Sequence, residues 1–238
     1  SNRLISKFAK VIMVSWRKSE KYFPKDKTVF TGIPLREDIF NVKSNSFNIN
    51  KELPTIYISA GKTGSHLIND IIKDSLEKLL SICNVIHQCG DNSVYNDFGI
   101  LEAKYEDIKN ESKGKYNLRK FVFDDEIGEA YSKADLIVSR SGAHTISEII
   151  SLEKPAILIP IPWVSHNEQF VNADMVREAG LAEIIEQKNL IPSLLVEKIK
   201  HCLSNISLYK LKNKEDFKFL KKNSAGLIVD EIIKFSKK

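Results

Sequence analysis

The chain has 238 residues, 42% of them hydrophobic and 28% charged, a composition that is ordinary for a globular domain. No apolar run reaches the ~20 residues that span a bilayer, and none resembles a secretory signal. Three cysteines without CxxC spacing argue against disulfides and zinc and favour the cytoplasm. The net charge of +5 comes with lysine clusters near both ends. These clusters indicate solvated helix faces or, alternatively, contact with an anionic membrane surface, and without a basic stripe interleaved with aromatic residues no nucleic-acid partner is expected.

Short apolar runs rich in Ile and Val recur along the chain, separated by segments with helical periodicity. Such runs are typical of parallel strands buried on both faces. The predicted strands are Lys10–Ser15, Thr28–Thr31, Thr55–Ser59, Asn84–Gln88, Arg119–Phe123, Leu136–Ser139, Ala156–Pro160 and Ala182–Ile185.

The clearest helical pattern is Ser65–Leu80, where apolar residues recur every three or four positions. Strands that alternate with helices predict an α/β fold with a doubly wound, Rossmann-like parallel sheet and right-handed crossovers. The other predicted helices are Asp125–Ser132, Ala143–Ser151, Asn167–Glu178, Pro192–Leu203, Tyr209–Lys222 and Ala225–Phe235.

Residues 41–53 are polar and rich in asparagine, which predicts a loop ahead of the first central strand. We expect the complete domain to cover residues 34–222. Residues 1–33 hold too little structure to bury a core of their own, so we interpret them as the tail of a preceding domain and its linker. Residues 223–238 are expected to form a separate C-terminal helix.

The segment 139–172 is the most informative part of the chain, because it contains two strand-to-helix transitions close together. These transitions place two helix N-termini at one edge of the sheet, and helix N-termini suit phosphate groups. Glu148 lies within the first helix among isoleucines and needs a partner, for which a ribose diol is suitable; a helix-surface carboxylate is the alternative. The segment therefore predicts a site for a nucleotide diphosphate.

Arg140-Ser141-Gly142-Ala143 ends a predicted strand, where open α/β sheets bind ligands. We expect the amides of Ala143 and His144 to meet a phosphate. The alternative is a plain turn with Ser141 as the helix cap. His144 is a weak candidate for a catalytic base, because the sequence shows no carboxylate partner for it.

Gly61-Lys62-Thr63-Gly64 also lies between a strand and a helix. It is not a P-loop, because Ile56 occupies the position of the first glycine in that motif. It is either a turn whose backbone faces a diphosphate or an acceptor, or a turn that only joins the two elements.

His166-Asn167-Glu168-Gln169 follows the next strand and could bind sugar hydroxyls or cap a helix. Trp163, just before it, could stack on a ligand, but packing of the loop is the simpler interpretation.

These segments together resemble the MurG-type glycosyltransferases, which transfer N-acetylglucosamine from UDP-N-acetylglucosamine to a lipid-linked muramyl-pentapeptide. The resemblance extends over almost the whole chain but only over the second half of the family's length. The motifs that carry it are Gly32-Ile33-Pro34-Leu35-Arg36 (family G-N-P-V-R), Ala60-Gly61-Lys62-Thr63-Gly64 with Asn69 (G-G-S-Q-G…N), Phe123-Asp124-Asp125 (F-I-D-D), Ser139 to Glu148 (C-R-S-G-A-L-T-V-S-E) and Glu168-Gln169 with Asn172-Ala173 (Q-Q-Y-W-N-A).

The resemblance implies the C-terminal, UDP-sugar-binding half of a two-domain GT-B enzyme that inverts the anomeric carbon and uses no metal or other cofactor. The catalytic base and the site for the lipid-linked acceptor would belong to the N-terminal domain, and the enzyme would lie on the cytoplasmic face of the cell membrane. The C-terminal helix would cross back to that domain. The implied substrate-binding residues are Arg36, Gly61, Lys62, Gly64, Phe123, Asp124, Ser141, Gly142, Ala143, His144, Thr145, Glu148, Glu168 and Gln169.

By position, Arg36 and the turn 143–145 would face the diphosphate, the backbone near Asp124 the uracil, and Glu148 the ribose. Glu168 and Gln169 would hold the sugar hydroxyls. The adjacent carboxylates of Asp124 and Asp125 are interpreted as helix caps.

The sequence departs from the family pattern at a serine replaced by Lys62, a glutamine replaced by Glu168 and a glycine replaced by Ala60. Because Glu168 stands at a sugar-binding position, the choice of sugar stays open. The alternatives are a transferase that adds glucose or galactose to a diacylglycerol lipid and a non-catalytic UDP-sugar-binding subunit that works with a membrane partner. A UDP-sugar epimerase fits less well, because this half lacks a clear acid–base pair.

Overall fold

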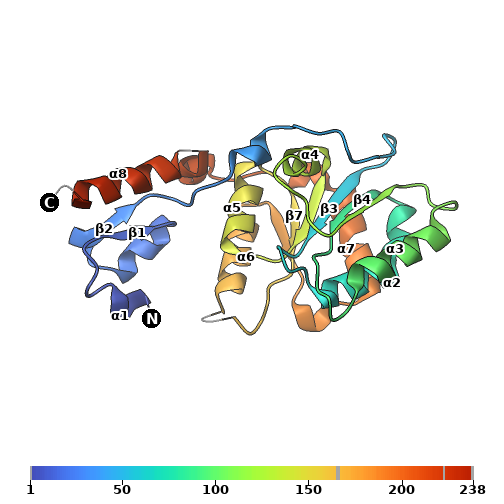
Figure 1. The fold of residues 1–238 in the computed structure, drawn as a ribbon, viewed down its shortest axis with the longest axis horizontal. Helices are drawn as coiled ribbons and strands as arrows, with labels where there is room; N and C mark the ends of the chain where they lie inside the picture. Colours follow the sequence, from blue (N-terminus) through green and yellow to red (C-terminus); the bar gives the residue numbers. More distant parts are fainter. Residues whose placement is uncertain (1, 165–166, 222, 237–238) are drawn as a thin grey trace. The chain divides into compact units, whose positions relative to one another are not determined.

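The computed structural model describes residues 2–164, 167–221 and 223–236. It divides into two compact units, one of residues 37–212 and one that combines residues 1–36 with residues 213–238 (Figure 1). His166 and Lys222, which the sequence analysis assigned to a polar loop and to the end of a helix, lie outside the described residues. The assignment of residues 1–33 to a preceding domain stays a prediction.

The larger unit is built on a parallel sheet of six strands in the order β5-β4-β3-β6-β7-β8. Its first strand in the chain, β3, pairs with β4 on one side and with β6 on the other. Strands are therefore added outward from the centre in one direction and then in the other, which is the doubly wound topology that the sequence predicted. The strands are β3 (Thr55–Ser59), β4 (Asn84–Gln88), β5 (Tyr116–Arg119), β6 (Leu136–Ser139), β7 (Ala156–Leu158) and β8 (Ala182–Ile184).

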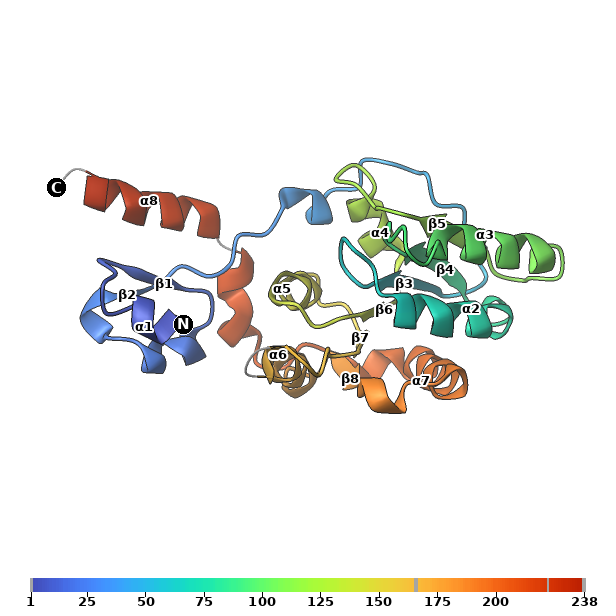
Figure 2. The same cartoon turned by 60° about the horizontal axis from the view of Figure 1, so that its bottom comes forward.

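Helices cover both faces of this sheet (Figures 1 and 2). On one face α2, α3 and α7 pack beside one another, and Ile58 of β3 joins Ile72 and Leu195 of these helices in a continuous core. Tyr57, the neighbour of Ile58, points to the other face and meets the ring of Tyr131 edge-on at 5.4 Å. The helices are α2 (His66–Leu80), α3 (Asp97–Ile108), α4 (Ile127–Lys133), α5 (Ala143–Ser151), α6 (Glu168–Glu178) and α7 (Pro192–Ser204).

Three sequence predictions are wrong in detail. The strand predicted at 119–123 is β5 at Tyr116–Arg119, and it pairs with β4 from Tyr116 opposite Val85. Helix α3 was not predicted at all. In place of an α-helix at 209–222 the chain forms the 3-10 helix η7 (Lys214–Lys221), and another 3-10 helix, η6 (Ile206–Leu208), comes just before this segment. A further 3-10 helix, η5 (Gln187–Asn189), precedes α7.

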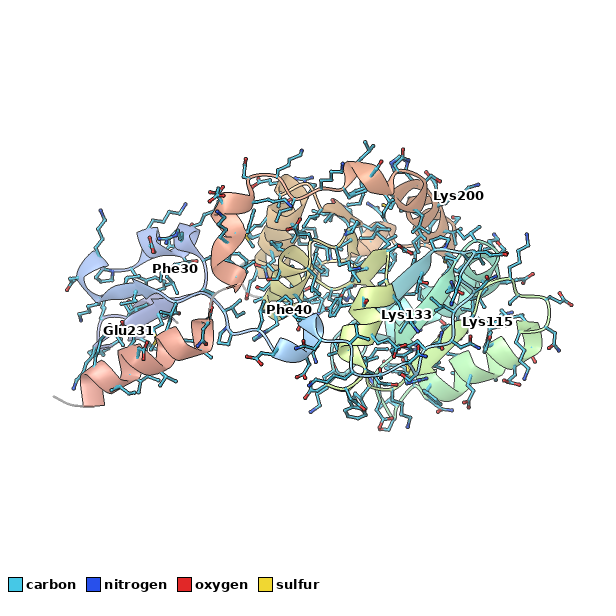
Figure 3. The ribbon with its side chains drawn as sticks, turned by 90° about the horizontal axis from the view of Figure 1, so that it is seen from above. Phe30, Phe40, Lys115, Lys133, Lys200 and Glu231 are labelled. Carbon is cyan, nitrogen blue, oxygen red and sulfur yellow. The ribbon has the colours of Figure 1, made fainter. Side chains whose placement is uncertain are left out.

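The segment 41–53 is the predicted loop, and it follows the 3-10 helix η3 (Glu37–Phe40). A buried carboxylate holds it to α4. Glu129, 1% exposed, accepts hydrogen bonds from the amides of Ser46 (2.8 Å) and Phe47 (3.1 Å) and from the ammonium of Lys133 (2.6 Å). Lys133, which is labelled in Figure 3, also donates to the carbonyl of Phe47 at 2.7 Å. A polar loop is thus fixed by one fully paired buried charge.

The smaller unit contains a pair of parallel strands, with Met13 opposite Val29, and the C-terminal helix, which lies beside these strands (Figures 1 and 2). Several of its large apolar side chains are exposed, among them Phe8 (84%) and Ile232 (53%). No helix among the described residues is long and apolar enough to cross a bilayer. The elements are α1 (Asn2–Ile5), β1 (Ile12–Val14), η1 (Arg17–Tyr22), η2 (Lys25–Lys27), β2 (Thr28–Phe30), η7 and α8 (Ser224–Ser236).

Candidate nucleotide-sugar site

The loops after β3 and β6 lie side by side at the carboxyl edge of the sheet. Ser59, the last residue of β3, is opposite Ser139, the last residue of β6, and the Ser139 hydroxyl donates to the Ser59 carbonyl. From β3 the strands progress outward to β4 and β5, and from β6 they progress in the opposite direction to β7 and β8. This reversal creates the crevice in which open α/β sheets bind their ligands.

The two helix starts that the sequence placed at one edge belong to α5 and α6, which follow the neighbouring strands β6 and β7. The N-cap of α5 is Gly142, and no side chain caps this helix. Ser141 was considered as the cap, but its hydroxyl donates to the carbonyl of Gln169 at 2.8 Å. The first bond within the helix runs from the amide of Ile146 to the carbonyl of Gly142, so the amides of residues 143–145 have no partner in the helix.

Protein atoms do not fill the bend at Gly142. A methyl group added there would have no neighbour within 4 Å, and the same holds at Gly61, whose φ is +84°. The side chains of Lys62 and His144 beside these glycines are exposed. The two bends predicted to approach a diphosphate therefore leave open space at their backbones.

Gly64 is packed closely against the protein itself, and its role in substrate binding stays a prediction. Its φ is +70°, and a methyl group there would overlap the carbonyl oxygen of Cys89, just after β4. The close approach that Gly64 permits is to the neighbouring strand end. Gly90, on the other side of the same contact, has a φ of +81° and is equally crowded, by the backbone of Thr63.

The sequence analysis missed Gln88, which connects three strand ends. From the last position of β4, its amide nitrogen donates to the carbonyl of Gly61 at 2.9 Å, and its amide oxygen accepts from the amide of Val122 at 2.8 Å. Gln88 is 8% exposed. One neutral side chain thus fixes the loop after β3 against the loop after β5, and no sequence motif marks it.

A second unpredicted cluster lies where α2 and α3 begin. The carboxylate of Asp97, 6% exposed, accepts from the Asn69 amide at 2.7 Å and lies 2.7 Å from Nδ1 of His66. The imidazole of His66 stacks on the ring of Tyr95 at 3.7 Å. Asn69, matched to the family motif in the sequence analysis, also donates to the carbonyl of Cys89 at 2.9 Å, so it serves the packing of this loop.

Glu148 is buried, 8% exposed, on the second turn of α5. Its Oε2 accepts a hydrogen bond of 2.6 Å from the hydroxyl of Tyr131 on α4. The sequence argument assigned the required partner to a ribose, whereas the protein itself supplies one. The alternative of a carboxylate on the helix surface is wrong, and ribose binding by Glu148 stays a prediction.

Gln169 joins the loops after β6 and β7. Its amide oxygen accepts from the amide of Ile161 at 3.1 Å and from that of Ser141 at 3.4 Å. Asn172, one turn further along α6, donates to the carbonyl of Ser141 at 2.9 Å. The Gln169 oxygen is therefore occupied, which leaves its NH₂ group as the donor for a sugar hydroxyl, while Glu168 is exposed.

Phe123 and Asp124 lie in the loop between β5 and α4, and both are exposed. The carbonyl of Phe123 accepts from the amides of Glu126 (3.0 Å) and Ile127 (2.8 Å) and so closes the first turn before α4. The N-cap of α4 is Glu126, without a side-chain bond, so the interpretation of Asp124 and Asp125 as caps is wrong. Arg36 belongs to the smaller unit, and its role toward a diphosphate stays a prediction.

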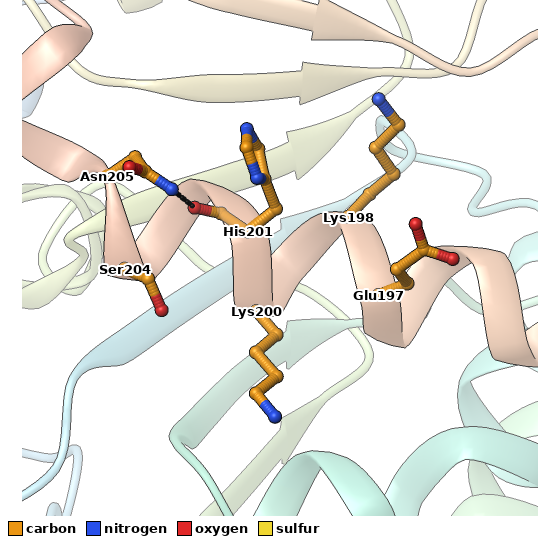
Figure 4. Close-up of a pocket in the computed structure, with 6 residues that line it drawn as sticks. All are labelled: Glu197, Lys198, Lys200, His201, Ser204 and Asn205. Atoms are coloured by element: carbon orange, nitrogen blue, oxygen red, sulfur yellow. Dashed lines mark hydrogen bonds between the residues drawn. The ribbon is translucent and has the colours of Figure 1, made fainter.

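A surface cavity of about 550 Å³ lies elsewhere, along the second half of α7, and its walls include Lys200, His201 and Asn205 (Figure 4). These residues come from a helix that begins after the carboxyl end of β8 and runs back along the sheet. None of the predicted site residues lines this cavity. The site at the strand ends is open to solvent rather than enclosed, and we assign it from its backbone geometry and topology.

The strand order, the crevice between β3 and β6 and the uncapped start of α5 define a Rossmann-like ligand-binding domain of the doubly wound class. Residues 55–230 match the glycosyltransferase family 28 C-terminal domain, and the chain belongs to this family.

The chain is also similar in sequence to individual curated proteins. A UDP-N-acetylglucosamine–N-acetylmuramyl-(pentapeptide) pyrophosphoryl-undecaprenol N-acetylglucosamine transferase of Clostridium botulinum is 33% identical over 98% of this chain and 62% of its own length. The transferase of the same name from Flavobacterium psychrophilum is 34% identical, with the same coverage. The crystal structure of Acinetobacter baumannii MurG superimposes with a TM-score of 0.68 at 25% identity, covering 98% of this chain and 63% of that one. The chain thus spans about three-fifths of the length of these relatives.

Proposed function

We propose that this chain is the donor-binding half of an inverting glycosyltransferase. The whole enzyme would move N-acetylglucosamine from UDP-N-acetylglucosamine to a lipid-diphosphate-linked muramyl-pentapeptide, the transfer that the names of the relatives describe. The proposal depends on the start of α5, which has no capping side chain and leaves open space at Gly142. This helix start lies where the strand order of a family 28 domain reverses. The identities of 33–34% to proteins with this activity support the substrate.

The diphosphate would accept hydrogen bonds from the amides of residues 143–145 and gain from the partial positive charge at the start of α5. As UDP leaves, negative charge accumulates on the β-phosphate, and fixed amide dipoles stabilise that charge without rearrangement. The carboxylate of Glu148 would accept from the ribose, and the NH₂ group of Gln169 would donate to a sugar hydroxyl. The backbone beside Phe123 and Asp124 would contact the uracil.

The lipid-linked acceptor would bind through the part of the relatives' length that this chain does not span. That part would also contact the anionic membrane surface on the cytoplasmic side, with the exposed lysines of this chain as a secondary contribution. We expect the chain on its own to bind the donor weakly and not to turn it over. Mixing the chain with UDP-N-acetylglucosamine and a lipid-linked acceptor is therefore expected to release no UDP.

Calorimetric titration of the chain with UDP tests donor binding, with ADP as the control nucleotide. We expect binding of UDP and clearly weaker binding of ADP, and a chain that takes up neither would refute the proposal. Gly142→Ala tests whether the open space at the start of α5 is the binding site. The backbone there has φ −65°, which alanine adopts freely, and the added methyl group meets no protein atom. The variant should therefore keep its melting temperature and lose UDP affinity, because the methyl group would occupy space meant for a phosphate.

Lys200→Ala, in the α7 cavity, is the matched control and should leave UDP binding unchanged. Competition among UDP-N-acetylglucosamine, UDP-glucose and UDP-galactose then tests the sugar choice that Glu168 leaves open. Preference for UDP-glucose or UDP-galactose would favour transfer to a diacylglycerol lipid instead.

A further inference from the structure

Arg140 is a buried cation at the carboxyl end of β6. Its side chain is 7% exposed, and it stands directly before the Ser141–Gly142 turn that starts α5. β6 lies between β3 and β7, so Arg140 is at the centre of the sheet edge where the candidate site lies. Arginine is rarely buried to this extent unless a negative charge accompanies it.

The guanidinium group connects the two strand ends that flank β6. One terminal nitrogen donates to the carbonyl of Ile159, after β7, at 3.1 Å, and the other donates to the hydroxyl of Ser65, the N-cap of α2, at 2.9 Å. The third nitrogen, Nε, is buried and has no hydrogen-bond partner. Arg140 therefore fixes the starts of α2 and α5 and the end of β7 relative to one another.

Both hydrogen-bond partners of Arg140 are neutral, and among the described residues no carboxylate forms an ion pair with it. Burial lowers the pKa of Arg140 to about 10, so the side chain is still charged at neutral pH. The buried carboxylate of Glu129 differs in this respect, because it is paired with the ammonium of Lys133. A desolvated cation without a counter-charge is costly, and an anion bound at this edge would relieve that cost.

A helix start without a cap does not single out this place, since α3 and α7 also lack capping side chains. What distinguishes the start of α5 is the unneutralised guanidinium behind it. We propose that Arg140 is the positioning residue and counter-charge for the diphosphate of the nucleotide sugar, acting through its electric field. This inference rests on the proposed donor site and adds a residue that its sequence motif did not assign to binding.

The rival explanation is that Arg140 only holds the three loops together. Comparing an anionic with a neutral ligand distinguishes the two explanations. A counter-charge raises the affinity for UDP more than that for uridine, whereas a clamp changes both affinities equally. Titrations of the whole chain with UDP and with uridine, followed by NMR chemical shifts, give the ratio of the two affinities. The variants are Arg140→Gln, which removes the charge, and Arg140→Lys, which keeps the charge with fewer fixed hydrogen bonds.

We expect Arg140→Gln to lower UDP affinity about tenfold, which corresponds to about 1.4 kcal/mol, and to change uridine affinity much less. Arg140→Lys should keep the UDP-to-uridine ratio close to that of the wild type. Equal losses for UDP and uridine in the Gln variant, or loss of the ratio in the Lys variant, would overturn the inference. If the Gln variant does not fold, Arg140→Met, which also removes the charge, is measured in its place.

A wild-type chain that binds neither UDP nor uridine refutes the proposed donor site itself. A wild-type chain that binds UDP, together with an unchanged ratio in Arg140→Gln, refutes only the role of Arg140. Ser65→Ala is the control for the clamp, because it removes the hydroxyl that accepts from Arg140 and leaves the charge. The ratio of UDP affinity to uridine affinity should therefore be unchanged in Ser65→Ala.

Discussion

The hydroxyl of Tyr131 on α4 donates a hydrogen bond of 2.6 Å to Oε2 of Glu148 on α5. The residues are 3% and 8% exposed, and the Tyr131 ring also packs against Tyr57 at the centre of the sheet. The bond therefore fixes the carboxylate that the family resemblance assigns to the ribose. Its orientation is set by the protein before any ligand binds, which is how a binding group avoids ordering costs.

Tyr131→Phe tests this coupling. Removing the hydroxyl leaves a buried carboxylate short of a donor, so the free energy of unfolding should fall by about 1–3 kcal/mol. Urea unfolding of Tyr131→Phe, Glu148→Gln and the double variant measures the pair in a double-mutant cycle. The coupling should reach about 1 kcal/mol or more, as for hydrogen bonds to charged groups. Strictly additive effects would mean that the two side chains do not depend on each other.

The two glycines of the loop after β3 should lose stability to different extents on substitution. Gly64→Ala places a methyl group against the Cys89 carbonyl at a positive φ, so we expect a loss of more than about 3 kcal/mol or no folded protein. Gly61→Ala has the same backbone strain but open space, and should cost about 1–2 kcal/mol. Thermal unfolding of both variants checks the difference, and equal losses would contradict it.

The sequence predicted the sheet well because each of its central strands is a short buried segment with two Ile or Val residues. β3, β4 and β6 lie at the predicted residues. The edge strand β5 was misplaced because the apolar residues 121–123 follow it in a loop, where Val122 bonds to Gln88 and Phe123 is exposed. Edge strands need no continuous apolar run, so their bounds depend on the partner strand.

Helix α3 was not predicted although Phe98, Leu101 and Tyr105 recur at helical spacing and pack against the core. The pattern is weak in the sequence, because a glycine and the exposed Ile100 interrupt it. The helix predicted at 209–222 does not form, because tertiary contacts interrupt it. The amide of Lys212 donates to the carbonyl of Ala179 at 2.8 Å, and Asn213 turns the chain with a φ of +49°.

For the candidate site, the sequence identified the loops but not the side chains that hold them. Gln88 and Arg140 each connect strand ends that are far apart in the chain, and such contacts depend on strand order rather than on any local motif. The hydrogen bond from Tyr131 to Glu148 could not be predicted for the same reason, since Tyr131 reaches Glu148 only once α4 and α5 lie on one face of the sheet.

Glu129 should make the loop at 41–53 sensitive to acid. Burial raises the pKa of Glu129, but hydrogen bonds from Lys133, Ser44 and the amides of the loop outweigh it and lower the pKa to about 2 from 4.5. A carboxyl with a depressed pKa stabilises the folded state above its unfolded pKa. The contribution of about 3 kcal/mol is lost as the pH falls from 4.5 toward 2.

Glu129→Gln should remove most of this stabilisation at pH 7 and flatten the acid limb of the stability curve, as measured by urea unfolding across the pH range. Proteolysis within residues 41–53 should also become faster, because the loop loses its anchor. Glu77→Gln, at an exposed position on α2, is the control and should change neither. An unaltered acid limb in Glu129→Gln would show that the carboxylate does not carry the effect.

His87 predicts a separate loss of stability at milder pH. It is 1% exposed on β4, with Nδ1 2.8 Å from the Tyr116 hydroxyl, and burial lowers its pKa from 6.5 to about 3. Between these values the unfolded chain binds a proton that the folded chain excludes, so stability decreases as the pH falls. The slope approaches about 1.4 kcal/mol per pH unit below 6.5, which gives about 2 kcal/mol between pH 6.5 and 5.

Stability measured by urea unfolding at pH 7, 6 and 5 tests this slope before the carboxylates titrate. His87→Gln should be less stable at pH 7, because a packed ring is lost, but its stability should depend much less on pH in this window. His201→Gln, at an exposed position on α7, should keep the wild-type slope. If His87→Gln retains the full slope, another group takes up the proton and His87 is not buried in its neutral form.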